Sequence, residues 1–164
     1  MSSRSDDEIR AGYVHHGELA EHALAAAPDP AIDDETRDAL RTSGLVHRYF
    51  ELLEHPDEPI EPFASIFAKE IDFDFTMTKI ETLDQFGAWA TDFRSSFECF
   101  TLTVVDVEVE RIDAAVLVAH IDLDFDAVGN DGDRKTMQTT HRWTIENDTI
   151  AAITVNHREQ PEAG

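Results

Sequence analysis

Apolar residues follow two different periods along this chain, and the change of period divides it into two halves. Up to Phe97 they recur every three or four residues, which is the spacing of amphipathic helices. From Phe100 onwards they alternate with polar residues, which is the spacing of strands. Helices followed by a run of strands predict the α+β class, with the helices packed on one face of a curved antiparallel sheet.

Four helices are predicted in the first half. Acidic residues in the first turn of the first helix complement its dipole, its apolar stripe includes His16, and Pro28 with Pro30 ends it. An aspartate caps the second helix, in which Gly44 marks an interruption. The helices are expected at 6–27, 33–55, 63–70 and 83–97, with a short strand at 71–77 between the last two.

Four long strands are predicted in the second half, joined by turns rich in glycine, asparagine and aspartate. Short turns make successive strands antiparallel. The strands are expected at 100–112, 114–128, 134–146 and 149–159.

The first of these strands has apolar residues at both alternating sets of positions. Phe100, Leu102 and Val104 form one set, and Val105, Val107 and Val109 form the other. If the two sets lie on opposite faces, the outer face of the sheet is also buried, which predicts a homodimer.

Length and composition fit one intracellular domain. A chain of 164 residues has the size of a single domain, and its single cysteine, Cys99, excludes an internal disulfide and fits a reducing compartment. The acidic start of the chain lacks the apolar segment of a secretory signal, and no apolar run approaches the roughly 20 residues that span a membrane. We therefore predict a cytoplasmic protein with no membrane partner.

The charge excludes two further classes of partner. There are 35 acidic and 13 basic residues, which gives a formal net charge of −22. Nucleic acids and anionic membrane surfaces bind clustered lysine and arginine, so we predict neither as a partner. Acidic surfaces of this kind keep proteins soluble at high salt, and the composition fits either a salt-adapted source or an ordinary acidic protein.

Three segments resemble a known superfamily. They are Arg48-Tyr-Phe-Glu-Leu-Leu-Glu-His-Pro-Asp57, Phe63-Ala-Ser-Ile-Phe-Ala-Lys-Glu-Ile-Asp-Phe73 and His141-Arg-Trp-Thr-Ile-Glu-Asn-Asp-Thr-Ile150. Together with the order of elements, they resemble the nuclear transport factor 2-like superfamily, in particular its ketosteroid isomerases and SnoaL-like cyclases. The resemblance covers 45–160. It implies a cone-shaped, cystatin-like domain at 43–160, with a helical N-terminal extension at 1–42 and a tail at 161–164.

Strand parity and the resemblance together give the candidate site residues. His141 shares the less polar face of its strand with Trp143, so we expect it to point into the cone. The resemblance implies that Tyr49 donates a hydrogen bond to a substrate oxyanion and that His141 stands at the second donor position. A histidine there also suits general acid and base chemistry at neutral pH. The expected ligand-binding walls are His157, Trp143, Trp89, Phe75 and Phe93.

The resemblance has one departure that bears on function. The isomerase general base is an aspartate on the short strand, and Phe75 occupies that position here, with Asp74 on the opposite face. The resemblance implies a cofactor-independent isomerase, cyclase or dehydratase acting on a small hydrophobic carbonyl compound. The alternative is a non-catalytic ligand-binding or dimeric assembly module, in which Tyr49 and His141 are ordinary packed residues. We predict no cofactor and no metal, because the sequence has no glycine-rich phosphate loop and no convincing set of metal ligands.

Overall fold

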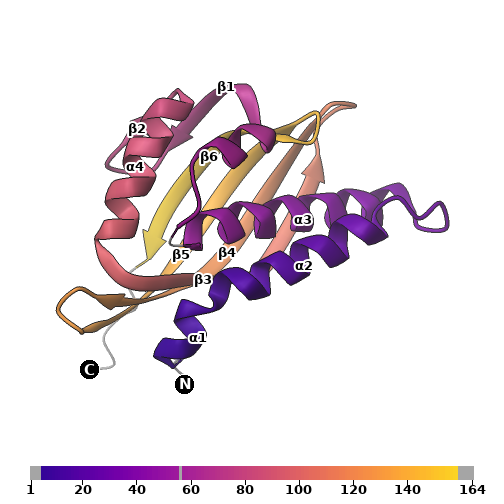
Figure 1. The fold of residues 1–164 in the computed structure, drawn as a ribbon. Helices are drawn as coiled ribbons and strands as arrows, with labels where there is room; N and C mark the ends of the chain where they lie inside the picture. Colours follow the sequence, from indigo (N-terminus) through magenta and orange to yellow (C-terminus); the bar gives the residue numbers. More distant parts are fainter. Residues whose placement is uncertain (1–4, 56, 159–164) are drawn as a thin grey trace.

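A curved sheet of six strands with helices on its concave face forms the body of the molecule, which confirms the predicted α+β class (Figure 1). This computed structural model describes residues 5–55 and 57–158, and the side chains only as far as residue 156. The helices are α1 (Asp6–Arg10), α2 (Gly12–Ala26), α3 (Asp34–Glu54), the 3₁₀ helix η1 (Glu61–Ser65) and α4 (Leu83–Ser95). The strands are β1 (Phe67–Asp74), β2 (Lys79–Ile80), β3 (Phe97–Arg111), β4 (Val116–Gly129), β5 (Arg134–Glu146) and β6 (Thr149–Arg158).

The sheet is mixed, whereas the sequence predicts an antiparallel one. Its order is β2-β1-β6-β5-β4-β3, and β3 forms one edge. The four long strands are antiparallel neighbours, as expected. Strand β1 pairs in parallel with β6, because the chain crosses the sheet before the meander begins.

The core lies between α3, α4 and the concave face. Tyr49 and Phe50 of α3 are buried against Trp143 of β5. The predicted inward face of β4 is confirmed, since Ile121 and Leu123 are almost fully buried while the intervening Asp122 is exposed. Burial of this continuous apolar cluster is what fixes the strand register.

The helical half of the chain departs from prediction in three places. The first helix is broken at Ala11, so that α1 and α2 are separate. Helix α3 runs unbroken through Gly44, where the side chain of Leu24 from α2 packs so closely that an added Cβ would lie 2.6 Å from it. The third helix ends at Ser65, and Phe67 begins β1. Phe63, Ile66 and Phe67 have helical spacing, but pairing with β6 determines the structure there.

A β-bulge overturns the prediction that β3 is apolar on both faces. Val104 lies opposite Leu123 and Val107 lies opposite Ile121, so one extra residue, Val105, is inserted between them. Val104, Val107 and Val109 consequently face the same core, and Val105 is left 60% exposed in the bulge. The argument for a buried outer face therefore fails, and the homodimer stays a prediction.

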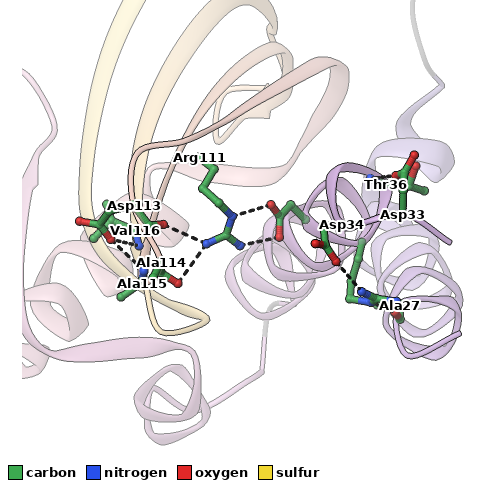
Figure 2. Close-up of polar contacts among 11 residues, drawn as sticks. Ala27, Asp33, Asp34, Thr36, Arg111, Asp113, Ala114, Ala115 and Val116 are labelled. Atoms are coloured by element: carbon green, nitrogen blue, oxygen red, sulfur yellow. Dashed lines mark hydrogen bonds and ion pairs between the residues drawn. The ribbon is translucent and has the colours of Figure 1, made fainter. Parts of the chain in front are cut away.

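Two arginines fasten α3 to its neighbours. Arg111 at the end of β3 donates from Nε and Nη2 to the carboxylate of Asp38, at 2.9 and 2.6 Å. Its Nη1 donates to the carbonyls of Asp113 and Ala114, as Figure 2 shows. At the other end of the helix, Arg94 donates to carbonyls of the last turn of α3, including that of Leu53 at 2.8 Å. Such bonds satisfy acceptors that a helix end leaves unpaired.

Within the described part of the chain, no helix combines the length and the apolar character that crossing a membrane requires.

Candidate functional site

The cone contains a cavity of about 260 Å³ between α3, α4 and the concave face of the sheet. Its walls are mostly aromatic and aliphatic. The lining residues are Tyr49, Phe50, Leu53, Phe75, Trp89, Phe93, Phe97, Leu102, Phe125, Met137, Thr139, His141 and Val155.

Tyr49 brings a hydroxyl to this apolar space. Its ring is 1% exposed and packs edge-on against Trp143, with the ring centroids 5.2 Å apart. The hydroxyl forms no hydrogen bond with any residue that the structure describes. Burial raises the pKa of Tyr49, with a small opposing effect from the charge of Arg94. The phenol therefore stays protonated at neutral pH and can donate a hydrogen bond.

His141 lines the same cavity from β5, and its neighbour fixes its tautomer. The indole Nε1 of Trp143 donates to His141 Nδ1 at 3.1 Å. Indole nitrogen is only a donor, so Nδ1 of the neutral ring must be the acceptor, and the ring proton lies on Nε2. In this tautomer Nε2 is a hydrogen-bond donor, and the sole nitrogen able to accept a proton is engaged by Trp143.

A third polar group, Thr139, lines the cavity two residues before His141. The residue is 4% exposed, and its hydroxyl has no hydrogen-bond partner among the described residues. A buried polar group without a partner costs free energy, which makes this hydroxyl a candidate contact for a ligand or a water molecule. Thr139 lies on the face that parity predicts to point inward, so that signal was sufficient to find it.

The wall of the cavity on the side of α4 consists of aromatic rings. Trp89 and Phe93 stack at 5.0 Å with 17° between their planes, and Phe75 lies 4.4 Å from Trp89. Phe75 thus lines the cavity, whereas the carboxylate of Asp74 accepts a hydrogen bond from the backbone N–H of Thr76. No aspartate or glutamate lines this cavity among the described residues.

The structure therefore brings together five of the seven candidate site residues. Tyr49, His141, Phe75, Trp89 and Phe93 share one cavity. Trp143 is fully buried behind the wall, where it orients His141. The side chain of His157 lies outside the described part of the structure. In the described ranges, no group of three or more histidine, cysteine, aspartate or glutamate side chains could hold a metal ion.

Comparison of the chain with known proteins identifies its fold. No family model matches the sequence, and no curated protein matches it. Solved structures do match, at low identity. One is a presumed scytalone dehydratase from Novosphingobium aromaticivorans, with 10% identity, a TM-score of 0.63, and coverage of 79% of this chain and 88% of that chain.

Two other matches come from different bacteria. A presumed SnoaL-like polyketide cyclase from Jannaschia sp. CCS1 has 12% identity and a TM-score of 0.57, over 71% of this chain and 85% of that chain. A nuclear transport factor 2-like superfamily protein from Salmonella enterica has 18% identity and a TM-score of 0.57, over 73% of this chain and 90% of that chain. This chain therefore has the nuclear transport factor 2-like fold.

Proposed function

We propose that the cone binds a small hydrophobic compound with a carbonyl, enol or phenol oxygen, and that Tyr49 and His141 donate hydrogen bonds to that oxygen. The observation that carries the proposal is a cavity of about 260 Å³ with aromatic walls, in which a protonated phenol and an Nε2-protonated imidazole are lining groups. A concave apolar pocket with a few convergent polar groups is the usual form of a ligand site.

The volume of the cavity sets the size of the compound. An apolar cavity of roughly 150 Å³ holds one benzene molecule. A cavity of about 260 Å³ therefore suits a compound of one or two rings. The stacked rings of Trp89 and Phe93 favour a flat ligand, because aromatic pairs gain from offset stacking.

The two donors would do more than hold the ligand. Hydrogen bonds aimed at a carbonyl oxygen strengthen as negative charge develops there, which lowers the barrier to enolisation. This chemistry is shared by isomerases, cyclases and dehydratases, and two structural neighbours carry the names of a cyclase and a dehydratase.

A second candidate function is ligand binding without turnover. It is favoured by one observation, the lack of a carboxylate among the described cavity residues. His141 does not easily replace that base, because Trp143 occupies the nitrogen that would accept the proton. The oxygen-binding role and the proton-transfer role therefore need separate tests.

The binding role can be tested with 2-naphthol, a two-ring phenol whose fluorescence reports both binding and ionisation. We expect saturable binding that weakens roughly tenfold in Tyr49→Phe and in His141→Leu, since each removes one hydrogen-bond donor. Tyr13→Phe and His120→Leu are the matched controls, because Tyr13 packs on His55 outside the cavity and His120 is exposed on β4. Equal binding by all four variants would overturn the proposal.

The proton-transfer role can be tested by incubating the protein with a cyclic enone in D₂O and following deuterium incorporation beside the carbonyl by NMR. Incorporation that Tyr49→Phe slows by roughly 100-fold or more would support catalysis. Binding of 2-naphthol with no accelerated exchange for any enone tested would support the non-catalytic alternative.

A further inference from the structure

A second polar cluster lies outside the cavity, where the N-terminal helices meet the edge of the sheet. His16 of α2 is 3% exposed, and its Nε2 lies 2.9 Å from the carboxylate of Glu54 and 2.8 Å from the carbonyl oxygen of Leu102. Its Nδ1 lies 2.9 Å from Nδ1 of His47, which belongs to α3. Glu54 also accepts from the hydroxyl of Thr101 at 2.6 Å. Two histidines and a carboxylate are thus buried together.

The cluster covers backbone groups that an edge strand leaves unpaired. Among the described residues, no strand lies beyond β3. At Leu102 the N–H donates to Glu54 at 3.0 Å, and the C=O accepts from His16. One side-chain acceptor and one side-chain donor therefore occupy the place of a seventh strand at this residue. Covering an edge residue in this way opposes pairing with another chain at that position.

The hydrogen-bond geometry allows one proton, but not two, between the facing Nδ1 atoms of His16 and His47. His16 Nε2 faces two acceptors, so it carries a proton. The facing Nδ1 atoms then need one donor and one acceptor, whichever ring supplies the donor. If both rings are cationic, two N–H groups face each other across 2.9 Å and two positive charges share one carboxylate.

The surroundings of His47 oppose the second proton. Burial, followed by the charges of His16 and His15, lowers the pKa of His47 from 6.5 to about 4. The remaining charged group of the cluster is Glu54, which lies beyond His16, and Glu51 one turn along α3 is paired with Arg48. Strand β3 contributes Thr101, Leu102, Thr103 and Val104 on this side, none of which titrates.

We propose that the His16–His47–Glu54 cluster is a proton-operated latch, which keeps α1 and α2 docked on the edge of β3 until a second proton enters the histidine pair. The released state takes up that proton near pH 6.5, and the docked state does so only near pH 4. Docking is therefore at full strength above about pH 6.5 and weakens as the pH falls, by up to roughly tenfold for each pH unit.

The backbone N–H of Leu102 is the local reporter of this latch. Its hydrogen exchange, measured residue by residue by NMR and divided by the intrinsic rate, gives a protection factor at each pH. Between pH 7 and pH 4.5 we expect this protection to fall by roughly 30-fold or more, while that of Ile121 in the neighbouring inner strand β4 changes little. While the helices stay docked, the His47 ring signals should titrate only near pH 4.

Two variants separate the latch from ordinary acid unfolding. His47→Gln removes the second titrating ring, so the protection of Leu102 should no longer depend on pH. His22→Gln changes an exposed histidine on the same helix and should leave the dependence intact. If Leu102 loses protection together with Ile121, or keeps it down to pH 4.5 while His47 titrates near pH 6.5, the proposal is wrong. The direct titration of His47 decides the matter even if His47→Gln docks poorly.

Discussion

Helix α3 is tied to strand β3 at both ends, and the two ties use different chemistry. Near the start of the helix, Asp38 pairs with Arg111, whose side chain is 43% exposed (Figure 2). At the last residue of the helix, Glu54 binds Thr101, Leu102 and His16, and the Glu54 and His16 side chains are 1% and 4% exposed.

Burial determines how strongly each of these two polar contacts contributes to stability and how it responds to salt and pH. A guanidinium that is half exposed keeps its charge, and Asp38 raises the pKa of Arg111 further, but water and salt screen the pair. The polar groups around Glu54 are buried, so a group that loses its partner there cannot bond to solvent instead. Their hydrogen bonds are therefore costly to break. Because one of those groups is His16, whose ring also contacts His47, this buried contact is the one that depends on pH.

The largest expected effect comes from removing the central acceptor of the buried tie. Glu54→Leu leaves the Thr101 hydroxyl, the Leu102 N–H and His16 without their acceptor. We expect a loss of about 3–4 kcal/mol in the free energy of unfolding, measured with urea. Glu51→Leu, which removes a partly exposed carboxylate one turn earlier, should cost about 0.5 kcal/mol or less. Similar losses in both variants would contradict the comparison.

The second largest effect is expected from adding a side chain next to Glu54 and Thr101. A Cβ at Gly12 would lie 2.1 Å from the Thr101 hydroxyl and 2.6 Å from Glu54, so Gly12→Ala must push α2 away. We expect a loss of about 2 kcal/mol. Gly17→Ala on the same helix meets mainly the flexible end of Glu51 and should be neutral or slightly stabilising. Thermal unfolding of the two variants side by side measures the difference.

The buried contact between His16, His47 and Glu54 should make stability depend on pH. Since the pKa of His47 is lowered to about 4, its contribution is complete above about pH 6.5 and is lost as the pH falls toward 4. We expect about 2 kcal/mol of stability to disappear over this range. In His47→Gln that part of the pH dependence should be absent, whereas in Arg111→Met it should remain. Urea titrations at several pH values test both statements.

Substitution at the exposed tie should matter less and should depend on salt. Arg111→Met loses the pair with Asp38 and the bonds to Asp113 and Ala114. We expect roughly half the loss of Glu54→Leu or less, and the loss should shrink in 1 M NaCl. The effect of Glu54→Leu should change little with salt, because the site is buried. A salt-independent effect of Arg111→Met would show that its role is mainly packing.

The smallest effect on stability is expected at Tyr49. Its hydroxyl has no hydrogen-bond partner in the described structure, so Tyr49→Phe removes no bond. The free energy of unfolding should change by about 0.5 kcal/mol or less. Tyr49 is as buried as Glu54, but we expect its hydroxyl to contribute to ligand binding and not to the stability of the fold. A large loss would instead indicate a structural role for the hydroxyl.

Element order and inward parity were predictable from the sequence because they depend on local periods. The four long strands lie within a few residues of their predicted bounds. His141 faces the core because an alternating strand with one apolar face has only one favourable orientation. The start of β1 was not predictable, since Phe63, Ile66 and Phe67 have helical spacing and only the distant β6 makes Phe67 a strand residue.

The buried contact between His16, His47 and Glu54 could not be predicted from the sequence for a similar reason. His16 stands in the apolar stripe of its helix, and His47 and Glu54 stand among buried positions of theirs, which are visible signals. What joins them is the docking of α2 on β3, a contact between segments that lie far apart in the chain. The bulge at Val105 was hidden as well, because a run of valines alternates equally well in either register.

That bulge also determines how the protein tolerates insertions and deletions. With the extra residue in place, the outer surface of this part of β3 and β4 carries Asp106, Glu108, Glu110, His120 and Asp122, all of them exposed. Deleting Val105 would restore simple alternation and turn either the valines or the preceding half-strand to the solvent side. Apolar side chains would then replace part of this charged surface, so the deletion of a single codon would favour aggregation.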